Sequence, residues 1–572
     1  MNPEMRRFSL RQGRAAATAG TRRGAAWPAL VQFMLIFAAL ASAYAFDAGG
    51  VIIDRTVPGP DTLQPFYMLR DILKHPDLAF GWDVPDAPYF LPDLVLVGLG
   101  MALAGGPKVS TVLAGFLQSF LILGLLFYLF RRTFGPVGAF AIGAALTVAA
   151  VFLLVEGELE LASGLHTFGP TFKIFYHGGA LLFALWLLVL ETPRAQGPTV
   201  PLVSGRSLAI VAILGAGLIS DPFLLIFFAL PFAGARIWQV LDGQMAWRDL
   251  PPVLARIAGA VVVMACARLV AAADTNMRTE RWDTVGELLA NLGTWLDYIT
   301  VDPDLENGSS FFLVLQIFQK VPVLATLAVL LWATLRRRPP PGVAASAGNG
   351  ADILLRFFTL AFFVNSGAVF VTDLYINAWS ARYLPMVTYG WVALVAAWLA
   401  LAMARLRPDM GKLAARLGVP ALAVAVAGAA WSLPDRALTR WFIAPNLGDR
   451  AYSQCLERAV ARYGGEGPHI LIAFYTYGRR AMADTERLDS FTVDRTGKAV
   501  PARYNHAHYR MRFFERTGLL RGPAFVFTRE LKQSRVRARF GPADHRLSCG
   551  EDHVLVYLDP RRVARRLTGG QP

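Results

Sequence analysis

The stretch from Val109 to Phe130 reads VSTVLAGFLQSFLILGLLFYLF, carries no charged side chain, and is followed directly by Arg131 and Arg132. A helix needs roughly 18 to 20 apolar residues to cross the ~30 Å of hydrocarbon in a bilayer. A helix that is apolar on all sides must be buried, either in protein or in lipid. The stretch therefore predicts a membrane-spanning helix with a basic cluster at its end.

Apolar stretches of this kind recur along the whole chain. The protein has 572 residues, of which 55% are hydrophobic and only 17% are charged. A soluble protein would interrupt such stretches with polar helix faces. The composition therefore predicts an α-helical polytopic membrane protein.

The basic residues of the chain gather at the ends of its apolar segments. The formal net charge is +15. The clusters are Arg6-Arg7, Arg22-Arg23, Arg131-Arg132, Arg336-Arg337-Arg338 and the segment from Arg405 to Arg416. Lys and Arg accumulate on the cytoplasmic side of membrane proteins. Because the charge is dispersed along the chain, we interpret it as an orientation signal and expect no nucleic-acid partner.

The preference of Lys and Arg for the cytoplasmic side predicts the course of the N-terminal part of the chain across the membrane. Residues 1–26 form a basic cytoplasmic segment, and we expect the first helix, at about 27–46, to be retained because no small-residue cleavage site follows it. The apolar run 88–104 either crosses the membrane or lies on its outer face. We favour an interfacial helix, because Arg131 and Arg132 then lie on the cytoplasmic side. The outer-face loop 47–108 would thus bear interfacial helices.

The rest of the transmembrane domain, predicted to span 27–433, alternates across the membrane. Further helices are expected at about 137–155, 174–190, 257–272, 312–334, 352–372, 384–403 and 418–433. The run 207–237 contains Ser220-Asp221-Pro222, and because proline breaks helices we predict a tight hairpin with Asp221 at its outer tip. A long polar loop is expected from Asp274 to Ser310. The total is about eleven crossings.

Residues 434–572 are polar and charged, which indicates a separate domain. Strand-like runs begin at His469, Ala524 and His553, and a helical stretch runs from Ala451 to Tyr463. This alternation predicts a small α/β domain. It contains Cys455 and Cys549, which are compatible with a disulfide in an oxidising compartment or with two buried thiols.

Acidic residues crowd the first outer loop, which also contains the most distinctive motifs. The stretch from Asp61 to Asp77 reads DTLQPFYMLRDILKHPD, and Tyr89-Phe90-Leu91-Pro92 follows it. Arg382-Tyr383-Leu384-Pro385 stands where a late helix would start from the outer face. In this order the motifs resemble the GT-C integral-membrane glycosyltransferases, particularly aminoarabinose-to-lipid-A transferases and protein O-mannosyltransferases. In that resemblance Asp61-Thr62 stands at an Asp-Glu motif, and Arg70-Asp71-Ile72-Leu73 stands at Arg-Glu-Met-Leu.

The resemblance implies transfer of a sugar from a polyprenyl-phosphate donor to an acceptor on the outer face, by an inverting single displacement. The acceptor must lose a proton as it attacks, and an unperturbed aspartate, with a pKa near ~4, is ionised at neutral pH and can accept it. Asp61 is the candidate catalytic base, and Asp54 is the second candidate. The alternative role of Asp61 is that of a helix N-cap.

The phosphate leaving group requires cations near the outer boundary of the membrane. Arginine can bind phosphate oxygens in a bidentate fork. Lys173 and His177 are four residues apart, which predicts that they share one helix face. Ionisable residues in membrane segments tend to be functional, although long side chains can instead snorkel to the headgroups. The candidate substrate-binding residues are Arg70, Lys173, His177, Arg268, Arg382 and Tyr383.

Other acidic side chains are expected to be solvated on the outer face. They are Glu156, Glu158, Glu160 and Asp221, and we assign them no catalytic role. A divalent metal could lie between Asp61 and either Asp54 or Asp83, but the spacing of these residues demands no cofactor.

Two departures from the GT-C pattern leave a different class of function open. Thr62 replaces the second acidic residue, and Leu91 stands where a lysine usually precedes the proline. The alternative is a non-catalytic membrane scaffold or a transporter with a periplasmic binding domain. The acceptor, whether glycan, lipid or protein, stays open. The abundance of Ala, Gly and Arg suggests a GC-rich bacterium, so we expect an inner-membrane protein surrounded by lipid, with a cytoplasmic N-terminus and a periplasmic C-terminal domain.

Overall fold

The structure is a computed structural model, which describes several parts of the chain. These are residues 30–31, 33–38, 60–74, 89–104, 106–158, 177–192, 203–270, 285–299, 310–336, 348–371, 383–405, 447–465, 467–474, 487–493, 514–515, 517–529, 531–550 and 552–568.

Helices account for most of the described residues before the C-terminal domain. They are α4 (Pro60–Lys74), the π-helix η2 (Phe90–Leu94), α5 (Val95–Ala104), α6 (Pro107–Phe134), α7 (Pro136–Glu158), α8 (Gly178–Glu191), α9 (Gly205–Ser220), the π-helix η4 (Leu225–Ala229), α10 (Leu230–Leu241), the 3₁₀ helix η5 (Trp247–Asp249), α11 (Pro251–Val270), α12 (Val285–Ile299), α13 (Ser310–Leu335), α15 (Gly348–Val371) and α16 (Pro385–Arg405).

The sequence of these helices explains why they pack into one apolar body. The core is almost entirely aliphatic and aromatic and draws on α6 to α11, α13, α15 and α16. Four described helices are long and apolar enough to cross a membrane, at Val109–Phe134, Trp247–Ala267, Gly350–Val371 and Pro385–Arg405. The predicted class, a mostly helical polytopic membrane protein, is confirmed. The count of about eleven crossings stays a prediction.

Several predicted boundaries can be compared with the structure. The predicted break at Ser220-Asp221-Pro222 is present, since α9 ends at Ser220 and η4 begins at Leu225. Helix α8 begins at Gly178, four residues later than expected, so His177 precedes the helix. The expected long polar loop contains the helix α12. The predicted first helix falls only partly, and the one at 418–433 wholly, outside the described residues.

Helix α5 and its neighbour α6 form a tight pair. At 1.5 Å per residue the ten residues of α5 are only about 15 Å long, too short to span ~30 Å of hydrocarbon. A Cβ on Gly100 would come within 2.3 Å of the Ser110 carbonyl oxygen, so glycine permits this close approach. The length of α5 agrees with the prediction of an interfacial helix.

The C-terminal domain contains a five-stranded sheet in the order β2-β1-β3-β5-β4. Its strands are β1 (His469–Phe474), β2 (Leu488–Val493), β3 (Ala524–Phe527), β4 (His545–Cys549) and β5 (Asp552–Tyr557), and its helices are α19 (Leu447–Tyr463), α22 (Gln533–Phe540) and α23 (Pro560–Leu567). β1 pairs in parallel with β2 and β3, whereas β5 is antiparallel to β3 and β4. The predicted α/β character of this domain is confirmed.

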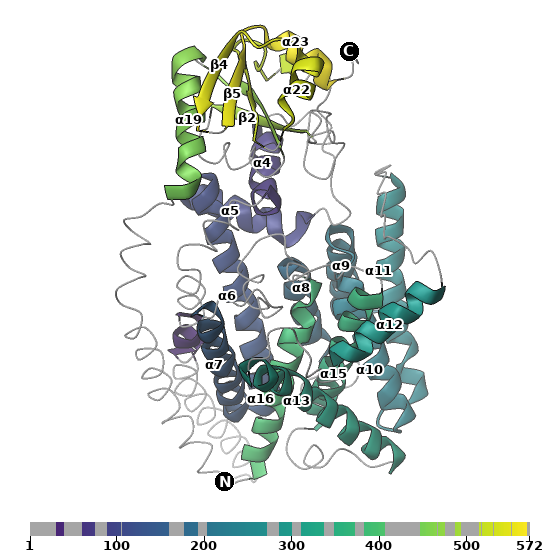
Figure 1. Ribbon diagram of the computed structural model, residues 1–572. Coiled ribbons are helices and arrows are strands. Elements are labelled where there is room, and N and C mark those ends of the chain that lie inside the picture. Colours follow the sequence, from purple (N-terminus) through teal and green to yellow (C-terminus); the bar gives the residue numbers. More distant parts are fainter. Residues whose placement is uncertain are drawn as a thin grey trace, which may run out of the picture.

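Alternation along the strands places helices on both faces of the sheet. Leu471 and Ala473 of β1 pack with Leu456 and Val460 of α19. Ile470 and Ile472 point to the other face, where α22 and α23 pack. Figure 1 shows this domain at the end of the molecule away from α7, α13 and α16, with α4 and α5 next to it.

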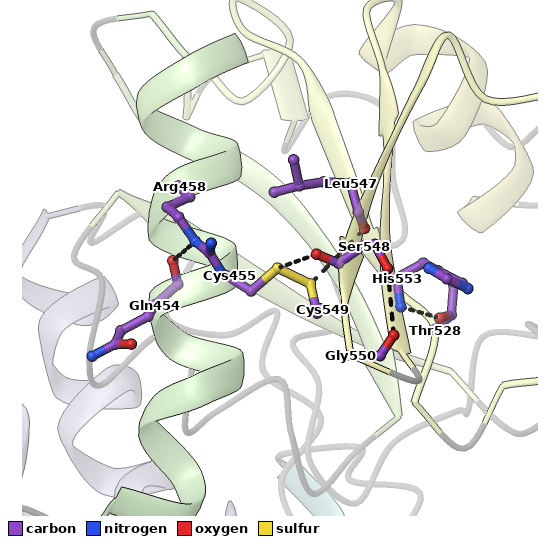
Figure 2. The surroundings of a disulfide bond; sticks show 9 residues. All are labelled: Gln454, Cys455, Arg458, Thr528, Leu547, Ser548, Cys549, Gly550 and His553. Atoms are coloured by element: carbon purple, nitrogen blue, oxygen red, sulfur yellow. Dashed lines mark hydrogen bonds between the residues drawn. A yellow bond between two sulfur atoms is a disulfide. The ribbon is translucent and has the colours of Figure 1, made fainter.

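A disulfide joins α19 to the edge strand β4. It links Cys455 and Cys549, whose Cα atoms are 5.9 Å apart and whose sequence separation is 94 residues (Figure 2). Of the two alternatives that the sequence left open, the structure has the disulfide rather than two free thiols. The disulfide attaches α19 to the edge of the sheet.

Candidate functional site

The candidate site is built around His177, the residue that precedes α8. Its Nδ1 atom lies 2.7 Å from Oδ2 of Asp221, and both side chains are only 3% exposed. Asp221 follows the last residue of α9, and its other oxygen, Oδ1, accepts a hydrogen bond of 3.0 Å from the Phe223 backbone N–H. One buried carboxylate therefore orients the imidazole and also closes the turn at Pro222.

Tyr89 contacts the other nitrogen of the same imidazole. Its hydroxyl oxygen is 3.3 Å from Nε2 of His177. The backbone N–H of Tyr89 donates to the Ser220 carbonyl at 2.9 Å, and that of Leu91 donates to the Ser220 hydroxyl at 2.8 Å. The segment before η2 is thus attached to the end of α9. With Nδ1 donating to Asp221, Nε2 of a neutral His177 can accept from the Tyr89 hydroxyl.

Two of these residues adopt a backbone conformation that is uncommon for side-chain-bearing residues. Tyr89 has φ of 52° and His177 has φ of 60°. The left-handed region is uncommon for residues other than glycine and occurs often at functional sites. Both residues use it to direct their side chains toward each other at the start of a helix.

Aromatic rings enclose the imidazole. The ring centroids of His177 and Phe223 are 4.1 Å apart, and those of His177 and Tyr383 are 5.3 Å apart. Phe223 also stacks on Tyr383, at 5.4 Å. Asn365 positions Tyr383, since its Nδ2 donates to the Tyr383 carbonyl at 2.8 Å. We call Tyr89, His177, Asp221, Phe223 and Tyr383 the His177 cluster.

Glycines allow η2 to lie directly on the first turn of α8. A Cβ on Gly179 would come within 2.3 Å of Oδ2 of Asp93 and 2.7 Å of Cδ of Pro92. Asp93 is 1% exposed, and its carboxylate is thereby placed at a helix N-terminus, where the macrodipole favours negative charge. This packing holds the segment of Tyr89 against α8.

The His177 cluster is connected to α4, the helix that contains Asp61. Leu63, Phe66 and Met68 of α4 pack with Leu96 of α5, and Tyr89 packs against this group. Tyr89 therefore contacts the imidazole and also packs against the apolar cluster to which α4 and α5 both contribute.

Arg70 joins α4 to the C-terminal domain. Its Nη2 atom is 2.9 Å from Oδ1 of Asp489 in β2, and its guanidinium lies 4.9 Å from the ring centroid of Tyr67. The two charged side chains are 19% and 22% exposed, so water screens this pair only in part. The arrangement places the sheet over the helix of the predicted base.

The predicted site residues divide into four groups, the first of which is Arg70, paired with Asp489. His177 and Tyr383 are brought together, and they meet the predicted Tyr89 motif. Asp61 and Arg268 lie in α4 and α11, but their side chains are outside the described part, as are Asp54, Lys173 and Arg382 entirely.

Two predictions about this region were wrong. His177 is not on a helical face, because α8 begins after it and its φ is positive. Asp221 is not solvated, because it is 2% exposed and bound to His177. The turn residues Ser220-Asp221-Pro222 predicted a solvated tip. The contact of Asp221 with His177, 44 positions earlier, has no signal in the sequence.

No metal centre is seen in the part of the chain that the structure describes. There, no group of three or more His, Cys, Asp or Glu side chains could hold an ion. Asp54 and Asp83, two of the suggested ligands, lie outside this part.

Comparison with known proteins finds similar solved structures, among them the two that follow. No protein-family model matches the chain, and no curated protein matches it. The chain is similar to ArnT from Cupriavidus metallidurans, whose crystal structure was determined with undecaprenyl phosphate bound: the identity is 16%, the TM-score is 0.49, and the match covers 93% of this chain and 98% of ArnT. It is also similar to an oligosaccharyltransferase from Archaeoglobus fulgidus, in complex with Zn and sulfate, at 14% identity and a TM-score of 0.41, covering 85% of this chain and 67% of that one. Because both TM-scores are below 0.5, the assignment of function depends on the residues of this chain.

Proposed function

We propose that this protein is a membrane glycosyltransferase that transfers a sugar from a polyprenyl-phosphate donor to an envelope acceptor. The observation that supports it best is the position of Tyr89. The sequence predicted the Tyr89 motif, His177, Tyr383 and the Asp61 helix as parts of one site, although they are far apart along the chain. In the structure Tyr89 contacts His177 and packs against the apolar cluster to which α4 contributes, and the Tyr383 ring also lies against the imidazole.

The His177 cluster would line the site of the donor phosphate, while nearby cations would balance the phosphate charge. Tyr89 and Tyr383 are partly exposed, whereas His177 is 3% exposed. We therefore assign His177 as a positioning residue that orients the Tyr89 hydroxyl, and the two tyrosines as the groups that face the substrate. Arg382 precedes Tyr383 directly and Lys173 lies four residues before His177, so both are close enough along the chain to supply positive charge to the phosphate.

Asp61 would act as the base. In the proposed step the acceptor oxygen or nitrogen forms a bond to the anomeric carbon, while the bond from that carbon to the phosphate oxygen breaks. The proton of the acceptor goes to the Asp61 carboxylate, and the bonding electron pair leaves with the lipid phosphate. Cations near the phosphate stabilise the charge that develops there.

The proposed location is a bacterial inner membrane with the C-terminal domain on the periplasmic side. The disulfide between Cys455 and Cys549 supports that side, because disulfides persist in oxidising compartments. The donor would then enter from the outer leaflet, next to α4 and the sheet that lies over it.

Transfer by the reconstituted full-length protein tests this proposal. The assay would supply a polyprenyl-phosphate hexose in proteoliposomes and measure release of polyprenyl phosphate. We expect release by the wild type and its loss in Asp61→Asn, with Asp249→Asn, a carboxylate change in η5, as the control that keeps activity. Equal release by all three variants, or none by the wild type with any polyprenyl-phosphate sugar offered, would overturn the proposal.

A further inference from the structure

The C-terminal domain presents a dense basic surface on its two last helices. Three arginines lie in α22 and four in α23, and neither helix contains an acidic residue. The helices lie side by side, since Nη2 of Arg539 donates to the Arg566 carbonyl at 3.1 Å. We call this surface, which also includes Lys532, the basic face. Its exposed members are Lys532, Arg535, Arg537, Arg561, Arg565 and Arg566.

The few carboxylates near the basic face already have partners within the domain, and they neutralise only part of its positive charge. Asp544 lies 3.9 Å from Nη2 of Arg562, and Asp559 accepts from the Arg561 backbone N–H as the N-cap of α23. Arg562 also lies over the ring of Tyr557, 4.9 Å from its centroid. The exposed arginines therefore retain a strong net positive charge that a negatively charged partner would complement.

The apolar side chains of both helices point inward. Val536 and Phe540 of α22, and Val563 and Leu567 of α23, are buried in the core of the domain. A helix that binds at a membrane surface needs exposed apolar residues to insert. Between residues 531 and 568, among the described ones, Leu558 is the single exposed large apolar side chain. The basic face is thus built to bind charge without inserting into lipid.

Two further observations narrow the class of partner. Figure 1 shows α22 and α23 on the side of the sheet away from the apolar helices α7, α13 and α16. The disulfide of the same domain indicates an oxidising compartment, where nucleic acid is not the expected polyanion. Among anionic polymers, those that bear carboxylate or phosphate groups match the planar fork of arginine.

We propose that the basic face binds an anionic polysaccharide of the cell envelope. This inference does not depend on the transferase activity, although such binding would hold an envelope polymer close to α4. The contacts are electrostatic and exposed, so affinity should fall steeply with salt, as the Debye length shortens from about 14 Å to about 4 Å between about 0.05 M and 0.5 M salt.

Binding of polygalacturonate of defined length to the full-length protein tests the proposal. The protein would be held in neutral phosphatidylcholine nanodiscs, with neutral dextran of equal size as the control ligand. We expect salt-sensitive binding of polygalacturonate and none of dextran. The double variant Arg565→Glu/Arg566→Glu should weaken binding at least about tenfold. The matched control Arg458→Glu/Arg462→Glu, which makes the same charge change on exposed residues of α19, should bind as the wild type does.

Vesicles that contain phosphatidylglycerol test whether the ligand of the basic face is instead an anionic lipid. If the protein binds such vesicles through Arg565 and Arg566 but does not bind polygalacturonate, the basic face is a lipid site and the proposal is wrong. Failure to bind polygalacturonate at low salt, or equal loss in both double variants, would overturn it as well. Hydrogen exchange of β1 and β3 in each variant verifies that the domain is folded.

Discussion

The effect of the His177–Asp221 contact on activity can be measured separately from its effect on the stability of the fold. Asp221→Ala removes the acceptors of two buried donors, Nδ1–H of His177 and N–H of Phe223. An unsatisfied buried donor costs about 1–3 kcal/mol, so we expect a loss of about 2–4 kcal/mol once some relaxation is allowed. Asp221→Asn keeps an oxygen for the Phe223 N–H and should lower stability by only about 1 kcal/mol.

The asparagine variant should nevertheless reduce activity strongly. If its amide nitrogen faces Nδ1, the imidazole must carry its proton on Nε2 and would donate to Tyr89 instead of accepting from it. The Tyr89 hydroxyl would then accept from Nε2 and turn its own proton away from His177, which would change the position of the Tyr89 side chain in the proposed phosphate site. We expect at least about a tenfold loss of transfer, equivalent to ~1.4 kcal/mol of transition-state stabilisation.

Glu191 provides a matched control at the other end of α8. It forms a two-point ion pair with Arg256, with Nε to Oε1 and Nη2 to Oε2 both at 2.8 Å, and the two side chains are 4% and 1% exposed. Breaking such a buried pair costs about 3–5 kcal/mol, so Glu191→Gln should be the less stable variant. Its folded molecules should keep near-normal transfer, because Glu191 is the last residue of α8 and His177 precedes the first.

The two assays are the thermal midpoint of the purified protein and the transfer rate per folded molecule. We expect the two variants to rank in opposite order in the two assays. Glu191→Gln should have the lower thermal midpoint, and Asp221→Asn should have the lower transfer rate. If activity simply follows stability in all variants, the His177 cluster has a structural role alone.

Three further predictions concern α4 and the C-terminal domain. Arg70→Ala should lower transfer while changing stability by at most about 1 kcal/mol, and the swap Arg70→Asp/Asp489→Arg should restore part of the rate; a swap no better than Arg70→Ala contradicts the role of this pair. Cys455→Ser removes the disulfide and should destabilise the C-terminal domain by about 2–4 kcal/mol, measured by hydrogen exchange of α19 and β4. The control Cys266→Ser should leave this exchange unchanged. Equal exchange in both variants would contradict a stabilising role of the disulfide. Burial, with a smaller contribution from Arg487, lowers the pKa of His469 from 6.5, so the unfolded domain binds the proton more readily and stability should fall as pH drops below 6.5. His469→Gln should flatten that pH dependence of exchange in β1, His545→Gln should not, and an unchanged slope in His469→Gln refutes the assignment.

Local sequence signals predicted those elements that local chemistry decides. The strand at His469–Phe474 has the predicted bounds, because an apolar run of six residues between polar segments fits a buried strand. The break after Ser220 was predicted because proline cannot continue a helix.

The helix α12 shows a signal that the loop prediction overlooked. Its apolar residues Leu288, Leu292, Trp295 and Ile299 recur at spacings of three and four, which is typical of an amphipathic helix. In the structure Nε1 of Trp295 donates to the Ser366 hydroxyl at 3.0 Å, which attaches α12 to α15. The polar residues between these positions concealed the pattern.

The site itself was predicted only in part. Motif order placed Tyr89 and Tyr383 in one region, but no periodicity connects His177 with Asp221 or Tyr89 with Ser220. These contacts depend on how α8, α9 and the segment before η2 pack. The left-handed backbone of Tyr89 and His177 likewise has no signal in the sequence, since most residues with a side chain avoid this conformation.

Photo-crosslinking can show whether the His177 cluster forms the phosphate site of a lipid-linked sugar donor. A polyprenyl-phosphate analogue with a photoreactive group next to the phosphate would be bound to the full-length protein in nanodiscs, and the labelled peptides identified by mass spectrometry. We predict labels on the segments of Tyr89 and Tyr383, competed by unlabelled polyprenyl phosphate. Labels confined to the opposite end of α8, around Glu191 and Arg256, would contradict the account.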